Sequence, residues 1–260
     1  MIEFLFAAYE RNGSAEKCKV YDFGANVGEY AKMLLSLRDK YDNASCEVVA
    51  YEPNPISYNE LLNRVPEEYG RFHAVNKGVS SIHGSLPFYY RNVKGKKGDK
   101  LEFDIGATFD KSYAKPGGKS IKVEVITVEE SLSEDIRTDV LLLKFDIEGL
   151  EFQVLKTLEK ILTSFRVFAV QWERSWKGAK RHTHSIHDEI SIFARHNYIV
   201  YLIGKNNSDG IVLKVWPNDL NARVMSRKFD HTYITLNFIA IASDFDGEFR
   251  KIAEKSSCDL

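Results

Sequence analysis

The sequence predicts an α/β fold in which a mostly parallel sheet carries helices on both faces. Segments typical of strands and of helices alternate along most of the chain, as they do when helices cover a parallel sheet from two sides. Residues 139–147 (DVLLLKFDI) form a nearly continuous apolar run, which is typical of a strand buried on both faces. No segment rich in proline, glycine or serine divides the 260 residues, so we expect a single domain over residues 1–260.

The elements of the first third follow from hydrophobic periodicity. Over about residues 1–12, Ile2, Leu5, Phe6 and Tyr9 recur at helical spacing, so a short amphipathic helix that packs on the domain is expected. A PNP sequence after the second expected strand cannot continue that strand. Strands are expected over residues 17–23, 46–52, 71–79 and 84–90, and helices over residues 28–41 and 56–65.

A basic segment over about residues 91–119 interrupts this alternation. It is rich in glycine, lysine and aspartate and has no sustained period, so we predict a loop insertion. A solvated loop is the plainer interpretation of its lysine-rich part, and a lid that closes over a substrate is the functional one. The alternation then resumes. Strands are expected over residues 121–128, 139–147, 165–173, 198–204 and 231–243, and helices over residues 131–135, 149–162 and 185–197.

Composition disfavours several classes of partner and location. The formal net charge of −1 gives no support to a nucleic-acid partner. No apolar stretch reaches the roughly 20 residues that a membrane span requires. The cysteines are Cys18, Cys46 and Cys258, and this odd number favours reduced, buried thiols over a disulfide framework. We therefore expect a cytoplasmic protein.

The stretch VYDFGANVGEY, residues 20–30, leads from the first strand into the first helix through a turn with two glycines. In open parallel sheets, ligands bind beyond the carboxyl ends of the strands. Gly24 permits a sharp turn and the close approach of a ligand, and Gly28 would let the start of the helix pack tightly on the strand. The G-x-N-x-G spacing matches neither the dinucleotide nor the phosphate-loop motif. Asp22 disfavours a pyrophosphate and suits a positive group, such as the ammonium of an amino acid.

The second strand ends in Glu52, at a position where a carboxylate accepts hydrogen bonds from the two hydroxyls of a ribose. An ammonium and a ribose without bridging phosphates together describe S-adenosylmethionine. A plainer interpretation is that the glycines are ordinary turn residues and that Glu52 is a surface acid. A nicotinamide dehydrogenase also fits Glu52, although the glycine spacing argues against it.

Residues 20–28 (VYDFGANVG), 48–55 (VVAYEPNP) and 141–157 (LLLKFDIEGLEFQVLKT) together resemble the FkbM-type methyltransferases, as does the segment VNKGVSSIHGSLPFYY. The resemblance implies a Rossmann-like class I methyltransferase fold with a mostly parallel seven-stranded sheet. It also implies transfer of a methyl group from S-adenosylmethionine to a hydroxyl of a sugar or polyketide. The residues expected to bind the cofactor are Asp22, Gly24, Asn26, Gly28, Glu52, Asn54, Val79 and Asp146.

Methyl transfer to a hydroxyl needs a group that takes the hydroxyl proton. Three carboxylates follow or end neighbouring strands, namely Asp146, Glu148 and Glu173, and each is a candidate base. A divalent ion held by these carboxylates is an alternative that we do not predict. A second alternative is that Asp146 and Glu148 only cap a helix.

A histidine often follows the fifth strand in the family, within a Glu-x-His sequence, but here the sequence is Glu173, Arg174 and Ser175. His187 at the start of a helix is our choice to replace it as base, and a polar loop is the plainer interpretation of its surroundings. Five aromatic residues are candidates for a wall on which a sugar stacks, although each is more often a core residue. They are Tyr89, Tyr90, Phe109, Trp172 and Trp176.

The leading hypothesis is an S-adenosylmethionine-dependent O-methyltransferase that acts on a sugar hydroxyl, in a glycan or glycoconjugate. A polyketide or another small hydroxylated metabolite is the alternative acceptor. A catalytically silent scaffold that only binds the cofactor is a different class of function. An RNA methyltransferase has little support from the balanced charge.

Overall fold

The computed structural model describes residues 2–11, 17–41, 46–65, 71–90, 107–111, 114, 116–132, 138–175, 184–205, 210–215, 235–245 and 247. Eight strands within these residues form the main sheet. They are β1 (Cys18–Phe23), β2 (Glu47–Tyr51), β3 (Phe72–Val75), β7 (Asp139–Phe145), β8 (Ala169–Ser175), β9 (Tyr198–Lys205), β10 (Gly210–Val215) and β11 (Thr235–Ala242). Their order is β10-β9-β11-β8-β7-β1-β2-β3. The five strands from β8 to β3 are parallel, whereas β11 is antiparallel to β8 and β9, and β10 is antiparallel to β9.

Seven of these strands form the mostly parallel, Rossmann-like sheet that the sequence predicted. Numbered along the chain, β3, β2, β1, β7, β8 and β9 follow the 3-2-1-4-5-6 order of dinucleotide-binding folds, with the antiparallel β11 inserted before the last strand. The direction of winding reverses between β1 and β7, which is the point where such sheets bind ligands. The eighth strand, β10, was not predicted, because a six-residue strand that only pairs as a hairpin with its predecessor has little pattern of its own.

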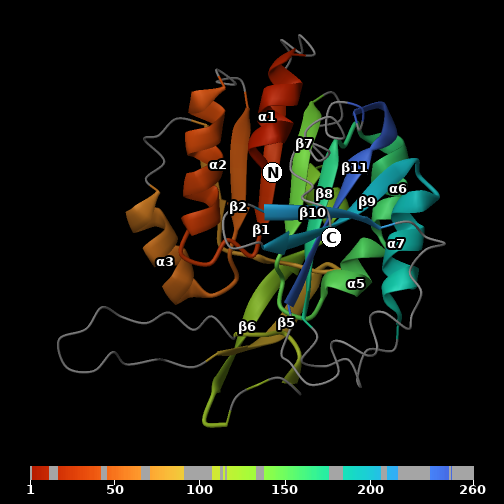
Figure 1. Cartoon of the computed structure of the whole chain (residues 1–260). Coiled ribbons are helices and arrows are strands. Elements are labelled where there is room, and N and C mark those ends of the chain that lie inside the picture. The colour runs from red at the N-terminus through yellow and green to blue at the C-terminus, as the bar shows by residue number, and fades with distance from the viewer. Residues whose placement is uncertain are drawn as a thin grey trace.

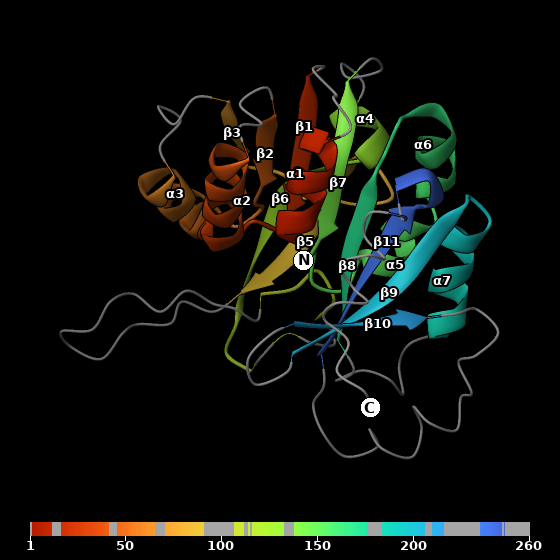
Figure 2. The ribbon, with the colours of Figure 1, turned by 45° about the horizontal axis from the view of Figure 1, so that its top comes forward.

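The helices cover the two faces of the main sheet in separate sets, as Figures 1 and 2 show. The first set is α1 (Ile2–Arg11), α2 (Glu29–Lys40) and α3 (Pro55–Arg64). The second set is α4 (Val128–Leu132), α5 (Glu151–Leu155), α6 (Leu158–Ser164) and α7 (Ile186–Ala194). We call the two sides of the sheet the α2 face and the α7 face. The first helix, α1, lies where a helix over about residues 1–12 was expected, with Leu5, Phe6 and Tyr9 buried.

The single helix expected over residues 149–162 is two helices, α5 and α6. The amide of Thr157 donates to the carbonyl of Val154, 2.9 Å away, and the Thr157 hydroxyl donates to the same carbonyl at 2.7 Å. Both contacts join residues three apart, as in a 3₁₀ turn, and this tighter turn separates α5 from α6. Both halves keep their apolar side toward the α7 face, so the periodicity across the break misled the sequence prediction.

Side chains of β1, β7 and β8 lie in rows across the carboxyl edge, the edge at which the parallel strands end. One row is polar and contains Asp22, Lys144 and Gln171, and we call it the inner row. The next row is aromatic and contains Phe23, Phe145 and Trp172. Successive residues of a strand point to opposite faces. The aromatic row packs in the core of the α7 face, so the inner row lies on the α2 face.

A second, three-stranded sheet lies beyond the carboxyl edge of the main sheet, toward the lower side of Figure 1. It consists of β4 (Gly78–Val79), β5 (Gly84–Tyr90) and β6 (Lys119–Ile126), in the order β4-β6-β5. Most of the expected basic insertion lies outside the described residues, so its role as a lid stays a prediction. Its described residues 107–111 run along β5, where Thr108 and Tyr89 exchange backbone hydrogen bonds of 2.8 and 2.9 Å.

The expectation of reduced thiols was wrong for two of the three cysteines. Cys18 in β1 and Cys46 just before β2 form a disulfide, with their Cα atoms 4.4 Å apart. The register of β1 and β2 pairs Lys19 with Glu47, which brings the two preceding cysteines opposite each other. The argument for a reducing location therefore loses its support. Among the described residues, no helix is long and apolar enough to cross a membrane.

Candidate active site

The turn after β1 depends on its two glycines. Gly24 and Gly28 have φ angles of +85° and +89°, a conformation that residues with a Cβ rarely adopt. A Cβ on Gly24 would lie 1.8 Å from the carbonyl oxygen of Asp146, so the glycine allows β1 and β7 to meet closely at the switch point. A Cβ on Gly28 would lie 2.5 Å from Leu61 of α3. The tight packing expected at Gly28 is therefore against helix α3, not against the strand.

Glu52 follows β2 directly, and the backbone holds it in place. Its two carboxylate oxygens accept hydrogen bonds of 2.8 Å from the amides of Asn26 and Asn54. The side chain is only 5% exposed. Burial raises the pKa of Glu52 to about 7, although the two amides and Lys144 favour the charged form. Because each carboxylate oxygen has two acceptor sites, Glu52 can still accept from a ligand.

A cleft lies between the turn after β1, the end of β2 and the small sheet. Its empty volume is about 540 Å³, including the open mouth. It is lined by Gly24, Asn26, Glu52, Asn54, Val79 and Asp146 of the expected cofactor-binding residues, and by Glu148. The side chain of Asn54 caps α3 by accepting from the amide of Ile56 at 3.0 Å, so its role in the cleft is carried by the backbone.

Asp22 does not line this cleft. Its carboxylate is fully buried and lies 2.9 Å from the ammonium of Lys144. Lys144 also donates to the carbonyl of Gly24 at 3.2 Å and lies 3.5 Å from the Asp146 carboxylate. The expectation that Asp22 meets the ammonium of a ligand is therefore corrected: the positive partner of Asp22 is a residue of the chain itself.

Lys144 lies within the segment 141–157, and the sequence patterns predicted no role for it. Burial lowers the pKa of Lys144, but the carboxylates of Asp22 and Asp146 outweigh this and hold the pKa above its ordinary value. The signal was present in the sequence, because a lysine inside the fully buried strand β7 needs an acidic partner. The ring of Tyr30 covers the ammonium, 5.0 Å from its centroid, and the Tyr30 hydroxyl donates to Gln171 at 2.6 Å.

Glu173 ends the expected strand at the carboxyl edge, on the same face as Gln171. Burial and, to a smaller extent, the charge of Asp146 raise the pKa of Glu173 to about 7, although Lys144 favours the charged form. A carboxyl group with a pKa near 7 suits proton transfer at neutral pH. Asp146 is also partly exposed, with 37% of its side chain accessible.

Glu148 lies on the rim of the cleft in a backbone conformation with φ +53°, and its side chain is exposed. Its carbonyl accepts from the hydroxyl of Thr108 at 2.7 Å, so the end of the basic insertion fixes this loop. Glu151 fixes the same loop from the other side, accepting from the amides of Ile147 and Gly149 at 3.0 and 2.9 Å. Neither Thr108 nor Glu151 was expected to have this role. The capping alternative in the sequence analysis applies to Glu151.

His187 lies on α7, on the opposite face of the sheet from Gln171, and it is exposed. Its Nδ1 atom is 3.2 Å from the hydroxyl of Ser191 on the same helix. The structure therefore does not bring His187 together with the carboxylates, and the proposal that it acts as base is corrected. The reason is that helix α7 packs on β9 along the α7 face, which a sequence pattern cannot assign.

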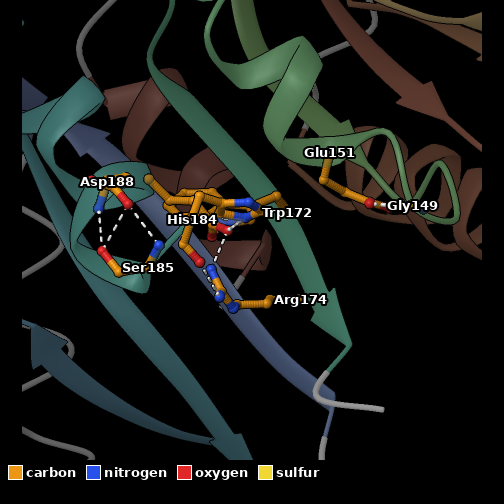
Figure 3. A network of polar contacts seen from close by, with 8 residues as sticks. Gly149, Glu151, Trp172, Arg174, His184, Ser185 and Asp188 are labelled. Carbon is orange, nitrogen blue, oxygen red and sulfur yellow. Dashed lines mark hydrogen bonds and ion pairs between the residues drawn. The ribbon is translucent and has the colours of Figure 1, made fainter. Parts of the chain in front are cut away.

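A different histidine, His184, belongs to a buried network at the end of β8 (Figure 3). Its Nε2 atom is 2.8 Å from a carboxylate oxygen of Glu189. The same carboxylate accepts from the indole of Trp172 at 2.9 Å and pairs with the guanidinium of Arg174. The ring of His184 stacks on Phe152 with centroids 3.6 Å apart. This network joins β8, α5 and α7.

Four of the five aromatic residues proposed for a sugar-stacking wall lie among the described residues, and they have different surroundings. Trp172 is 1% exposed and stacks on Phe193 and Phe238, so it is a core residue. Phe109 lines the cleft and packs edge-on against Phe88. Tyr89 and Tyr90 are partly buried in β5, and Trp176 lies outside the described residues. In the described part of the chain, no cluster of three residues suited to hold a metal ion is present.

Comparison with known protein families shows which family the chain belongs to. The family model described as the methyltransferase FkbM domain matches residues 22–200, which is more than half of the chain. The chain belongs to the FkbM methyltransferase family. The family uses S-adenosylmethionine, and the matched range contains Asp22, Glu52, Lys144 and Glu173.

A methyltransferase named sdnD from Sordaria araneosa is 29% identical over 161 residues. That match covers 54% of this chain and 60% of the relative, so this FkbM family member spans less than two thirds of the curated relative. The solved structure of methyltransferase FkbM from Methylobacillus flagellatus KT is 15% identical, with a TM-score of 0.46, covering 90% of this chain and 47% of that one. A putative rRNA methylase from Clostridium thermocellum is 7% identical, with a TM-score of 0.43, covering 89% of this chain and 94% of that one.

Proposed function

We propose that this FkbM family member is an S-adenosylmethionine-dependent O-methyltransferase that acts on a sugar hydroxyl, in a glycan or glycoconjugate. The observation that carries the cofactor part is Glu52, a buried carboxylate that two backbone amides hold at the edge of a cleft beside the glycine turn. The sugar part rests on the family resemblance of the sequence. A polyketide or another small hydroxylated metabolite remains the alternative acceptor.

The residues of the cleft fit S-adenosylmethionine. Glu52 can accept from the two ribose hydroxyls. The side-chain oxygen of Asn26 is buried and has no hydrogen-bond partner, whereas such atoms are normally satisfied in folded proteins. A ligand donor at the turn after β1 would satisfy it. Gly24 keeps the floor of the cleft free of a side chain.

When bound, S-adenosylmethionine supplies a methyl carbon attached to a positively charged sulfur, which is a good leaving group. The residues of the chain then need to orient the acceptor and remove a proton. We assign the proton transfer to Glu173, because it lies on the same face as the inner row, is partly buried and has a pKa near 7. Lys144 balances the negative charge of Asp22 and Asp146, so that Glu173 does not lie in an uncompensated cluster of carboxylates.

Calorimetric titration with S-adenosylmethionine and S-adenosylhomocysteine tests the cofactor site. We expect micromolar binding by the wild type, and a Kd about 10 to 100 times higher for Glu52→Gln, since hydrogen bonds to a charged group are worth about 1.5–3 kcal/mol. Glu47→Gln is the matched control, because Glu47 lies on the same strand at the end remote from the cleft. No binding by the wild type, with or without Mg²⁺, would refute the methyltransferase assignment.

Proton release provides a second readout of the same site. The raised pKa of Glu52 means that the carboxyl is largely protonated below pH 7. Ribose hydroxyls donate to the charged form, so binding lowers this pKa and releases a proton. The measured binding enthalpy at pH 6.5 should then depend on the ionisation enthalpy of the buffer. This dependence should disappear in Glu52→Gln.

A further inference from the structure

Two rows of polar side chains cross the α2 face at the carboxyl edge, and they differ in whether these side chains have partners within the protein. In the inner row, Lys144 pairs with Asp22 at 2.9 Å, and Gln171 accepts from the hydroxyl of Tyr30 at 2.6 Å. Each member of this row therefore has an ion-pair or hydrogen-bond partner within the protein. Beyond its ion pair, the Asp22 carboxylate has no hydrogen-bond partner among the described residues, but it is fully buried, so the inner row offers a ligand little to bind.

The outer row lies two residues further along the strands and consists of Asp146, Glu173 and Asn237. The register of β8 and β11 places Asn237 directly opposite Glu173. Opposite residues of an antiparallel pair project from the same face, with Cβ atoms about 4.5–5.5 Å apart. Asp146 belongs to the same row because it follows Lys144 by two residues, and its carboxylate is 3.5 Å from the Lys144 ammonium.

Glu173 and Asn237 are both partly buried, and neither side chain has a hydrogen bond or ion pair with another residue that the structure describes. An amide side chain offers two donors and an acceptor, and a carboxylate offers acceptors only. Within the part of the chain that the structure describes, these two adjacent polar side chains have no partner, whereas each member of the inner row has one. We take this as the mark of a place that a polar ligand fills.

The cleft and the outer row meet at one residue. Asp146 lines the cleft over β1, β2 and β7, and it is also the first member of the outer row, which continues over β8 and β11. A cofactor in the cleft and an acceptor on the outer row would therefore be neighbours at Asp146. On the α7 face of the same strand end, the side chain of Arg174 is closed off by its contacts with Glu189 and His184. The polar side chains of β8 outside this network, Gln171 and Glu173, lie on the α2 face.

We propose that the outer row is the acceptor site and that it takes a molecule with two neighbouring hydroxyl groups, a vicinal diol. Glu173 binds the hydroxyl that becomes methylated, and Asn237 binds the hydroxyl on the adjacent carbon, which makes Asn237 a specificity-determining residue. In the transfer, the acceptor oxygen forms a bond to the methyl carbon while the bond from that carbon to sulfur breaks. The hydroxyl proton passes to the Glu173 carboxylate. This inference rests on the proposed methyltransferase function.

The test compares diol acceptors with matched acceptors that lack one hydroxyl. The probes are the methyl glycosides of rhamnose, fucose, xylose and glucose, each paired with its deoxy analogues, with formation of S-adenosylhomocysteine as the readout. For the wild type we expect kcat/KM to be about tenfold higher for a diol than for its deoxy analogue, since one lost hydrogen bond of about 1 kcal/mol or slightly more corresponds to that ratio. In Asn237→Leu the two values should become equal, mainly through a higher KM for the diol.

Asn63→Leu on the exposed side of α3 is the matched control and should keep the wild-type preference. Calorimetry with S-adenosylhomocysteine and the melting temperature show whether each variant is folded, and Asn237→Ser replaces Asn237→Leu if the leucine variant is not. If the wild type binds S-adenosylhomocysteine but methylates no diol, the acceptor-site inference is wrong while the proposed function stands. The same holds if Asn237→Leu keeps the full preference for a diol over its deoxy analogue. If the wild type binds no cofactor, the proposed function fails with it.

Discussion

Replacing Lys144 with methionine should destabilise the protein strongly, because it leaves a buried negative charge without a partner. The Asp22 carboxylate is fully buried, and the ammonium of Lys144, 2.9 Å away, is its ion-pair partner. Removal of one member of a buried ion pair typically costs about 3–5 kcal/mol. Asp146 would lose less, since its side chain is 37% exposed and surface pairs contribute about 0–1 kcal/mol. The expected loss for Lys144→Met is therefore about 3–5 kcal/mol of unfolding free energy.

The double variant Asp22→Leu/Lys144→Met separates the missing charge from the altered packing. With both charges gone, an apolar pair of similar size replaces the ion pair, a change that is often neutral or stabilising. We expect the double variant to recover most of the stability that Lys144→Met loses. Lys19→Met is the matched control, because Lys19 lies on the same sheet in a partly exposed pair with Glu47 at 3.4 Å. It should cost less than about 1 kcal/mol.

Urea-induced unfolding at pH 8, followed by circular dichroism, measures these differences. The reasoning is refuted if Lys144→Met unfolds at the same urea concentration as the wild type. It is also refuted if the double variant is as unstable as the sum of the two single variants, because the loss would then come from packing and not from the charge of Asp22.

Two further predictions concern the site. With saturating S-adenosylmethionine, kcat should rise with pH through an apparent pKa near 7 and level off above it, because Glu173 accepts a proton only when ionised and faces Asp146 and Lys144. In Glu173→Gln, kcat should fall at least about 100-fold and the remaining rate should lose this pH dependence, whereas an unchanged profile would remove Glu173 as base. Gly24→Ala should abolish cofactor binding in calorimetry. The Cβ of the alanine would lie 1.8 Å from the carbonyl oxygen of Asp146, in a turn with φ +85°. Micromolar binding by this variant would show that the turn can shift.

The sequence was sufficient for the parts of the site that depend on local pattern. The glycine turn and Glu52 follow strands with a clear apolar run, and parallel strands that alternate with helices bring their carboxyl ends to one edge. That is why the cleft contains most of the residues expected to line it. Asp22 was placed at the correct strand end, but its partner Lys144 lies 122 residues later, and strand order decides that the two meet.

The predictions that were wrong share one cause. Contacts across the sheet depend on the order of the strands, on their register and on the face that each helix covers. The cysteine pair results from the register of β1 and β2. His187 was rejected as base because α7 packs on the opposite face from Glu173, and a helical period does not show which face a helix covers. Asn237 drew no attention because it lies inside an apolar strand, and only the antiparallel pairing of β11 with β8 brings it beside Glu173.

The two sides of strand β8 explain how a partly exposed carboxylate can be held in a fixed position. On the α7 face, Trp172 and Arg174 both bind the carboxylate of Glu189, so the end of the strand is anchored to helix α7. Glu173 lies between these two residues in the chain and therefore points to the α2 face. A base that must meet an acceptor hydroxyl gains from such anchoring, since misplacement by about 1 Å can cost 100-fold in rate. For Glu173 as the proposed base, the buried network of Figure 3 would support catalysis by fixing the backbone on either side of it, although none of the network's members lines the cleft described above.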